Sequence, residues 1–254
     1  MRILDIDLDF FLDRKAYSTV TSIARLDENE YKCWTEEATI NFLENNCGLS
    51  AENKIPGRFF THHDEVFYLL KELQEQNDFS LKFAIDHIDA HADLGMGDLS
   101  YEYISTEILH RPLLNRSTIE IKNGWKGISA GNYLAFAIAC RWITELKYIN
   151  IEKWFDDLPP FHFQNFDIST NTIELKIFNS SQIEQMQLGD FYVRARNIQP
   201  LAIEPSIPFQ KIEFKDFLGD GNYDYIFLTQ SPGYTPPSSD KLIPVIKNYM
   251  TLVG

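Results

Sequence analysis

The sequence predicts an α/β protein of three layers, with a mostly parallel sheet flanked by helices. Short apolar segments alternate with longer segments whose apolar residues recur at helical spacing, which is the pattern of βαβ units. Apolar residues make up 44% and charged residues 24% of the 254 residues, a composition that supports a sizeable core. Neither a repeat nor a low-complexity segment divides the chain, so we expect one domain over residues 1–254.

The predicted elements follow from the spacing of apolar residues along the chain. Thr35 is the expected N-cap of one helix, and Asp64 and Glu65 stand in the first turn of the next, where the helix dipole favours acids. The expected strands are 2–8, 81–89, 147–155, 172–178, 190–195 and 223–231, and the expected helices are 35–46, 64–77, 132–146 and one that begins at Lys241.

Composition and charge exclude several classes of protein. The net charge of −14 repels nucleic acid and anionic membranes, so we expect neither as a partner. No apolar run is long enough to cross a bilayer, and the segment MRILDIDLDFF has the features of neither a signal peptide nor a transit peptide. Cys33, Cys47 and Cys140 are odd in number and lack paired spacing, which predicts a reducing, cytoplasmic setting.

An unusual density of charge follows the predicted strand 81–89. Asp89, His91 and Asp93 fall at every second position in DAHAD, directly after apolar residues. In an extended chain, residues two apart point to the same side. We therefore expect these three side chains to converge, on condition that the extended geometry continues through them.

Two further segments carry the same kinds of residue. Asp5, Asp7 and Asp9 alternate with apolar residues in the first predicted strand, and His62 and His63 stand just before a predicted helix. The carboxyl ends of parallel strands lie at one edge of a sheet, where ligands bind. This arrangement is expected to bring the three segments together.

A cluster of several carboxylates needs cations. Four aspartates carry four negative charges, and without compensation their pKa values rise or the fold is destabilised. Two divalent ions supply the balancing charge, and carboxylate oxygen with one or two imidazoles suits Mn²⁺ or a similar ion. Taken singly, DIDLD is also typical of a DxD phosphatase with Mg²⁺, and a lone histidine is more often at the surface than bound to metal.

These segments resemble the motifs of the ureohydrolases, the family of arginase and agmatinase. DAHAD is similar to their DAHxD motif, DIDLD to SxDxD, and HHD more loosely to GGDHS. The combination of DIDLDFF, HHDEV, IDAHADL and a late YTP is closest to a branch that includes the peptide arginases. Those enzymes convert arginine side chains of ribosomally made precursor peptides into ornithine, and their fold would make this chain an arginase-like α/β domain.

The resemblance implies a site for two Mn²⁺ ions per chain. One ion would be held by His63, Asp89, Asp93 and Asp7. The other would be held by His91, Asp89, Asp7 and Asp9, so that Asp89 and Asp7 bridge the two. The alternative register, with Asp5 and Asp7 as the ligands from the first strand, stays open.

This sequence also departs from the pattern of the arginase family. The SxDxD counterpart comes first here, although in arginases it comes late in the chain. For the proton-shuttling histidine of arginases we name His110. Gln230 stands near the position where arginases have a guanidinium-binding glutamate. For that acid we therefore name Glu204, with Asp64 as an alternative. The loss of groups that read free arginine favours an arginine-containing peptide as substrate, hydrolysed to peptidyl ornithine and urea.

Three other functions remain as alternatives. A small-molecule ureohydrolase of the arginase or agmatinase type would use the same two metals. A metal-dependent amide deacetylase would use one zinc with an Asp-His-Asp set. A metal-binding protein without catalytic activity would hold metal without turnover.

Overall fold

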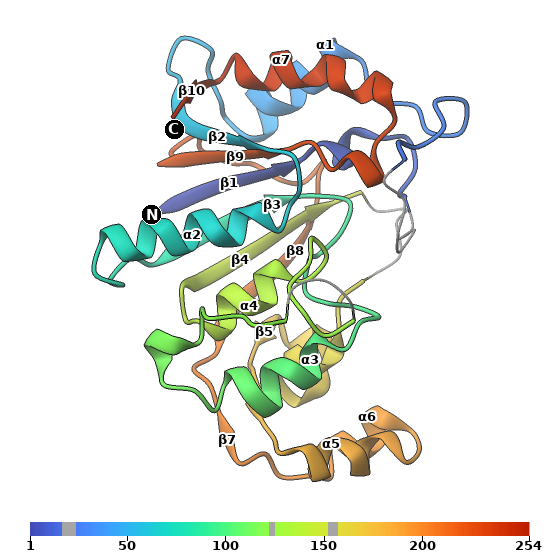
Figure 1. The fold of residues 1–254 in the computed structure, drawn as a ribbon. Coiled ribbons are helices and arrows are strands. Elements are labelled where there is room, and N and C mark those ends of the chain that lie inside the picture. The colour runs from blue at the N-terminus through green and yellow to red at the C-terminus, as the bar shows by residue number, and fades with distance from the viewer. Residues whose placement is uncertain (17–23, 122–124, 152–156, 254) are drawn as a thin grey trace.

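The computed structural model describes residues 1–16, 24–121, 125–151 and 157–253, and its centre is an eight-stranded sheet (Figure 1). The strand order is β10-β2-β9-β1-β3-β4-β8-β5, and every neighbouring pair is parallel except β5 and β8. The strands are β1 (Arg2–Asp7), β2 (Ile55–Phe60), β3 (Phe83–Ile88), β4 (Ile143–Asn150), β5 (Thr172–Ile173), β8 (Ile207–Glu213), β9 (Tyr225–Thr229) and β10 (Met250–Leu252). The predicted mostly parallel α/β architecture is confirmed.

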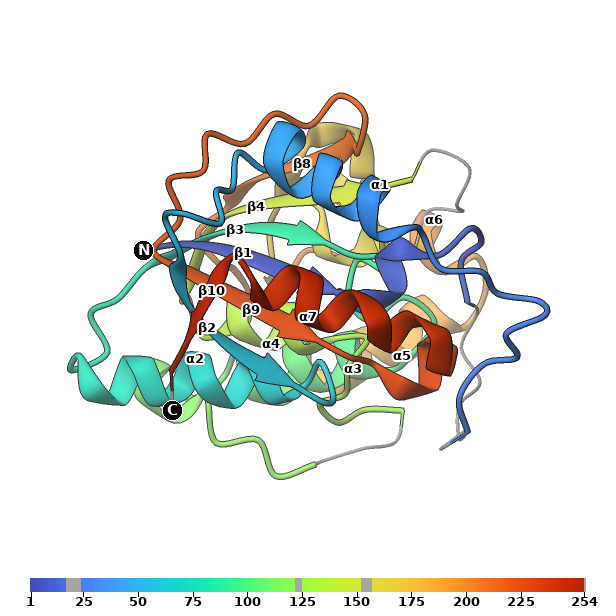
Figure 2. The ribbon, with the colours of Figure 1, turned by 90° about the horizontal axis from the view of Figure 1, so that it is seen from above.

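Helices cover both faces of the sheet, as Figures 1 and 2 show. Helices α1 (Glu36–Asn41) and α7 (Leu242–Lys247) pack together on one face. Helices α2 (Glu65–Gln76) and α4 (Tyr133–Ala139) pack together on the other, with α3 (Ser100–Tyr103) beyond them. The expected three layers are therefore present.

The central strands are apolar on both sides because both faces are covered. In β1, Ile3 packs into the core beneath α2 and α4, while Leu4 and Ile6 pack into the core beneath α1 and α7. In β3, Ile85 and Ile88 divide between the same two cores. This alternation fixes which side chains of β1 and β3 share a face at the carboxyl end of the sheet.

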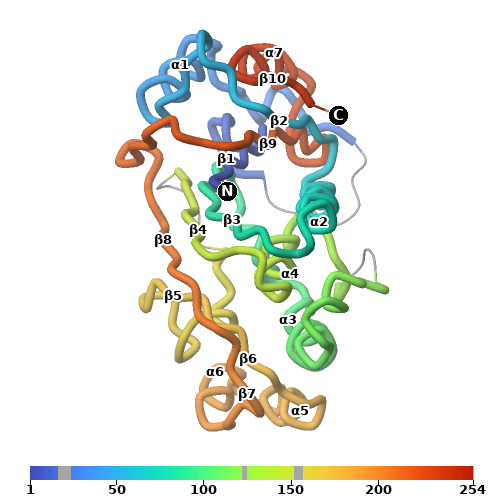
Figure 3. The backbone as a smooth tube through the Cα atoms, turned by 90° about the vertical axis from the view of Figure 1, so that its left-hand side faces the viewer, coloured from blue at the N-terminus to red at the C-terminus, as the bar shows by residue number. Residues whose placement is uncertain are grey.

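A smaller unit extends from one end of the sheet (Figure 3). It contains the two-stranded antiparallel sheet of β6 (Lys176–Ile177) and β7 (Ala202–Ile203), with α5 (Ser180–Gln187) and α6 (Phe191–Ala195) between them. The predicted strand over 190–195 is wrong, because the Asp190 side chain caps a helix there by accepting the Val193 N–H at 3.1 Å. The expected strand over 172–178 is two short strands, β5 and β6.

The expected helix over 132–146 ends early. Helix α4 stops at Ala139, Arg141 adopts φ +56°, and β4 begins at Ile143. A left-handed residue cannot continue a right-handed helix, so the chain reverses here. The strand expected over 147–155 begins earlier and ends at Asn150, and residues 152–155 lie outside the described part of the chain. Within the described ranges, no helix is long and apolar enough to span a bilayer.

Candidate metal centre

Acids and histidines from three segments meet at the carboxyl edge of the sheet. Strands β1 and β3 are parallel neighbours, and Asp5 is paired with His87, so Asp7 and Asp89 reach the same level at the strand ends. His63 joins them from the turn after β2 and before α2. The predicted meeting of the three segments is what the structure shows.

A first group of donor atoms surrounds one point. The Nδ1 atom of His63 lies 2.9 Å from Oδ2 of Asp7, 3.1 Å from Oδ2 of Asp89 and 3.0 Å from Oδ2 of Asp93. All four side chains are buried. Two ligands bound at about 2.1 Å and at right angles around a divalent ion are themselves about 3 Å apart, so the spacing suits a metal ion.

The hydrogen bonding of this group supports the same interpretation. Nδ1 of His63, Oδ2 of Asp89 and Oδ2 of Asp93 are buried and have no hydrogen-bond partner within the described residues. Buried polar atoms without partners are rare in folded proteins and need an explanation. Three that converge on one point could hold a cation.

A second group shares Asp89 with the first. Nδ1 of His91 lies 3.0 Å from Oδ2 of Asp9 and 3.6 Å from Oδ1 of Asp89. Asp89 therefore turns one oxygen toward each group, which is the arrangement of a bridging carboxylate. The buried Asp and His groups could thus hold metal ions, and they include all six of the predicted ligands: Asp7, Asp9, His63, Asp89, His91 and Asp93.

Both histidines are oriented by acceptors at their other nitrogen. Nε2 of His63 lies 3.2 Å from Oδ1 of Asp5, and Nε2 of His91 lies 2.9 Å from the carbonyl oxygen of Ala16. An acceptor at Nε2 holds a proton there and leaves Nδ1 as the atom that would bind a metal once its own proton is displaced, which is how proteins orient a metal-binding histidine. Asp5 thus faces the back of His63, which favours the register that uses Asp7 and Asp9.

Asp5 is the centre of a buried network that the sequence did not reveal. Its carboxylate accepts a hydrogen bond from the Tyr133 hydroxyl, and its Oδ2 lies 3.0 Å from Nδ1 of His87. Nε2 of His87 lies 3.1 Å from the carbonyl oxygen of His91. Tyr133 comes from α4, far along the chain, so no local pattern pointed to it.

The segment DAHAD is bent, and the assumption of an extended chain through it is wrong. Strand β3 ends at Ile88, and Asp93 adopts φ +49°. Similarly, β1 ends at Asp7, whose carboxylate accepts the Asp9 N–H at 3.1 Å at the start of a short 3₁₀ helix. The ligand side chains converge because these bends redirect them.

An ion pair holds the bent segment from outside. Oδ2 of Asp157 accepts the backbone N–H of Ala92 at 3.0 Å and lies 3.0 Å from Nζ of Lys15, which is 5% exposed. Lys15 precedes Ala16, whose carbonyl contacts His91. Segments from the N-terminal region and from beyond β4 therefore fix the backbone between His91 and Asp93.

The buried acids and histidines of the cluster shift one another's pKa values. Burial and the charges of Asp7 and Asp89 raise the pKa of Asp9, and burial with the charge of Asp89 raises the pKa of Asp93 to about 7. Burial alone would lower the pKa of His91, but the charges of Asp9 and Asp89 raise it. Without metal the cluster therefore retains protons, and a divalent ion would displace them.

The two residues named for catalysis lie elsewhere, which corrects that prediction. Both oxygens of Glu204 accept from Arg116 at 2.9 Å, and Nε of Arg141 donates to the same carboxylate. Arg141 precedes β4, so Glu204 is near the opposite edge of the sheet from the cluster. His110 is exposed, and its Nε2 donates to the carbonyl oxygen of Phe178.

Gln230 and Asp64, the other residues considered for binding the guanidinium group, have different surroundings. Gln230 follows β9 and donates to Asp240, while its neighbour Ser231 donates to Asp7 and so belongs to the site. Asp64 stands at the start of α2, and its pKa is raised by burial. Sequence reasoning missed Ser231 because φ +46° at that residue turns it toward β1.

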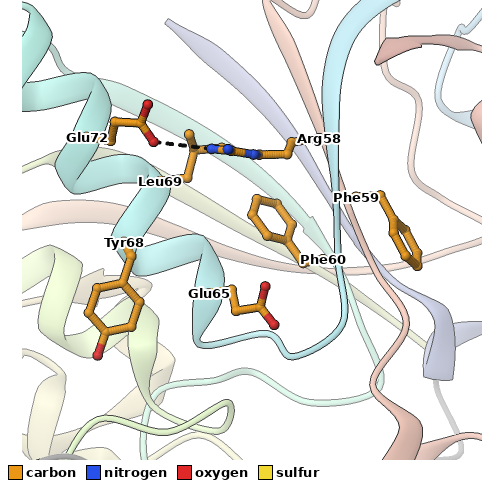
Figure 4. A pocket seen from close by; sticks show the side chains of 7 residues that line it. All are labelled: Arg58, Phe59, Phe60, Glu65, Tyr68, Leu69 and Glu72. Atoms are coloured by element: carbon orange, nitrogen blue, oxygen red, sulfur yellow. Dashed lines mark hydrogen bonds and ion pairs between the residues drawn. The ribbon is translucent and has the colours of Figure 1, made fainter. Parts of the chain in front are cut away.

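Two surface hollows are separate from the metal centre. The one in Figure 4 lies between β2 and α2, where Arg58 and Glu72 form an ion pair at 3.2 Å across it. The other, of about 600 Å³, lies beside α6 and β7. None of the six predicted ligands lines either hollow.

Comparison with known proteins adds no assignment. No protein-family model matches the chain. No curated protein and no solved structure matches it significantly. The interpretation of the site therefore rests on its geometry and on the sequence motifs.

Proposed function

We propose that the protein is a hydrolase that uses two Mn²⁺ ions to cleave the guanidinium group of arginine side chains in a peptide, giving peptidyl ornithine and urea. The observation that carries the proposal is the convergence of buried, unpaired donor atoms of His63, Asp89 and Asp93 on one point beside Asp7. A bound cation would give each of these buried atoms a partner.

Two ions, rather than one, are supported by the shared carboxylate. Asp89 divides its oxygens between the group of His63 and the group of His91. The four aspartates of the two groups carry four negative charges, which two divalent ions balance. When bound, such a pair polarises a substrate and provides a water nucleophile at neutral pH.

Residues of the chain orient the candidate ligands and attract a cationic substrate. Asp5 and the Ala16 carbonyl fix the tautomers of His63 and His91, and Ser231 holds Asp7 by donating to Oδ2. The net charge of −14 draws a cationic side chain toward the protein. The choice of arginine within a peptide rests on the motif resemblance and on this charge.

The test is incubation of the Mn²⁺-loaded protein with arginine-containing peptides. We expect urea in solution and, by mass spectrometry, peptides that have gained water and lost urea at single arginines. Replacing Asp89 with Ala should abolish both metal binding and urea release.

The alternatives give different products. Urea from free arginine or agmatine alone would indicate a small-molecule ureohydrolase, and acetate from an acetyl-lysine peptide would indicate a deacetylase. Urea from neither peptides nor small guanidino compounds, with metal bound, would rule out the ureohydrolase function.

A further inference from the structure

Asn150 is the neighbour of Asp89 at the carboxyl edge of the sheet. Strands β3 and β4 are parallel, with Ile88 paired to Ile149, and the Asp89 N–H donates to the Ile149 carbonyl at 3.3 Å. Two residues earlier, the rings of His87 and Tyr148 face each other with centroids 6.0 Å apart. Because side chains alternate along strands, Asn150 shares the face of Asp89.

Asn150 continues a polar row across the sheet. The row runs through the ends of β9, β1, β3, β4 and β8, which lie side by side in Figure 2. Its members are Thr229, Asp7, Asp89, Asn150 and Glu213. The row thus extends beyond the metal ligands toward β8.

The amide of Asn150 is buried without hydrogen bonds. The residue is 1% exposed, and neither Nδ2 nor Oδ1 has a partner in the described part of the chain. Asn132, which is equally buried, donates to Asp98 and Gly127 and accepts from Ser129. An amide that loses water without replacement bonds is unfavourable, so Asn150 is explained by a group that binds beside Asp89.

We infer that Asn150 is a substrate-binding residue whose Oδ1 accepts a hydrogen bond from the guanidinium group of the arginine substrate. This inference rests on the proposed function. A guanidinium has only donors, and the nearby carboxylates are committed to metal, so the substrate needs a further acceptor. A neutral amide supplies one without adding a further negative charge to the cluster.

The test compares Asn150→Leu with a matched control, Gln74→Met. Gln74 is also a buried amide with an unpaired oxygen, but its Nε2 donates to Leu81 O before β3, at the opposite edge of the sheet. We expect Asn150→Leu to keep the wild-type Mn²⁺ content and to unfold at the same or a higher temperature, since two unpaired polar atoms are removed. The KM for an arginine-containing peptide should rise about tenfold or more. Gln74→Met should leave KM unchanged.

Two outcomes overturn the inference. An unchanged KM in Asn150→Leu would do so while leaving the proposed function intact. A lower unfolding temperature with a wild-type KM would assign Asn150 a structural role.

A binding measurement separates this inference from the proposed function. Calorimetry with N-acetylarginine amide on the Mn²⁺-loaded protein should show weaker binding for Asn150→Leu, and unchanged binding for Gln74→Met. Binding of the amide without urea release would reject the proposed function and keep the role of Asn150. No binding to the wild type would reject both.

Discussion

Oδ1 of Asp5 lies 3.2 Å from Nε2 of His63, on the side of the imidazole opposite the atom that faces the cluster of aspartates. Asp5 is 0% exposed and His63 is 1% exposed. The pKa of Asp5 is lowered by both neighbouring histidines, His63 and His87, against the opposing effect of burial. A carboxylate behind a metal-binding histidine fixes the ring and increases its basicity.

Replacing Asp5 with Asn should therefore weaken Mn²⁺ binding about 10- to 100-fold, measured by calorimetry. Asp86→Asn is the matched control, because Asp86 lies one strand away, is also buried, and bonds Tyr223 outside the cluster. Equal losses of affinity in the two variants would contradict the orienting role of Asp5.

Because the candidate ligands form two groups, substitutions in different groups should remove different metal ions. Of the two groups, Asp93 belongs to that of His63, and Asp9 belongs to that of His91. We expect Asp93→Ala and Asp9→Ala each to reduce the metal content from two ions per chain to one, and Asp89→Ala to reduce it to none. Elemental analysis of the purified variants measures this. Full metal content in Asp9→Ala would exclude Asp9 as a ligand.

Metal binding should depend on pH, because protons compete for the same atoms. The pKa of Asp93 is raised to about 7 by burial and by Asp89, and the pKa of His91 is raised by Asp9 and Asp89 despite burial. Mn²⁺ must displace these protons, so its affinity should increase as pH rises from about 6 to 8. Calorimetry in two buffers of different ionisation enthalpy should show proton release. Binding without proton release would contradict the expectation.

The pKa of His87, a third histidine of the cluster, predicts how the stability of the metal-free protein depends on pH. Burial lowers the pKa of His87, but Asp89 and Asp5 raise it, for a net value of about 9. A raised pKa contributes stability that is complete below the unfolded value, about 6.5, and is lost as pH rises through about 9. Thermal unfolding in EDTA should show this decline, and Mn²⁺ should oppose it.

The placement of the candidate ligands at the ends of β1 and β3 could be predicted because the required information is local. Asp7 and Asp89 end apolar segments, and parallel strands place their ends together. The positions of the Asp93 and Ser231 side chains could not be predicted, because each depends on a left-handed backbone conformation at a residue other than glycine. The unpaired amide of Asn150 is likewise visible only once β3 and β4 are in register.

Two missed strands show how tertiary contacts override local signals. Strand β2 contains Pro56 and Gly57, and β8 contains Pro208, residues that disfavour strands. Gly57 is required there, since a Cβ would lie 2.6 Å from the Ile226 carbonyl oxygen of β9. Pro208 lies opposite Thr172 of the short edge strand β5.

The ion pair of Lys15 and Asp157 should matter for both stability and metal binding. Lys15→Met leaves the partly buried Asp157 carboxylate without its cation, so we expect the free energy of unfolding to fall by about 1 to 3 kcal/mol. Mn²⁺ affinity should also fall about tenfold, because Asp157 holds the Ala92 N–H between two ligands. Lys126→Met, which breaks a more exposed pair with Glu102, should cost at most about 1 kcal/mol and leave affinity unchanged.

Glu204 should contribute to stability and not to catalysis. Its carboxylate accepts two hydrogen bonds from Arg116, which is 5% exposed, and one from Arg141. Glu204→Gln removes the charge that compensates a buried guanidinium, so the free energy of unfolding should fall by about 3 to 5 kcal/mol. Denaturant unfolding measures this loss, while Mn²⁺ content and the KM for peptide should stay at wild-type values.

The pH dependence of the stability lost in Glu204→Gln distinguishes an ion pair from a neutral contact. Burial raises the pKa of Glu204, but the hydrogen bonds from Arg116 and Arg141 lower it overall. A lowered pKa contributes stability that is present above the unfolded value, about 4.3, and is lost as pH falls through the folded value. The difference in stability between wild type and Glu204→Gln should therefore be largest near neutral pH and shrink in acid. A raised KM with unchanged stability would instead return Glu204 to the role of substrate binding.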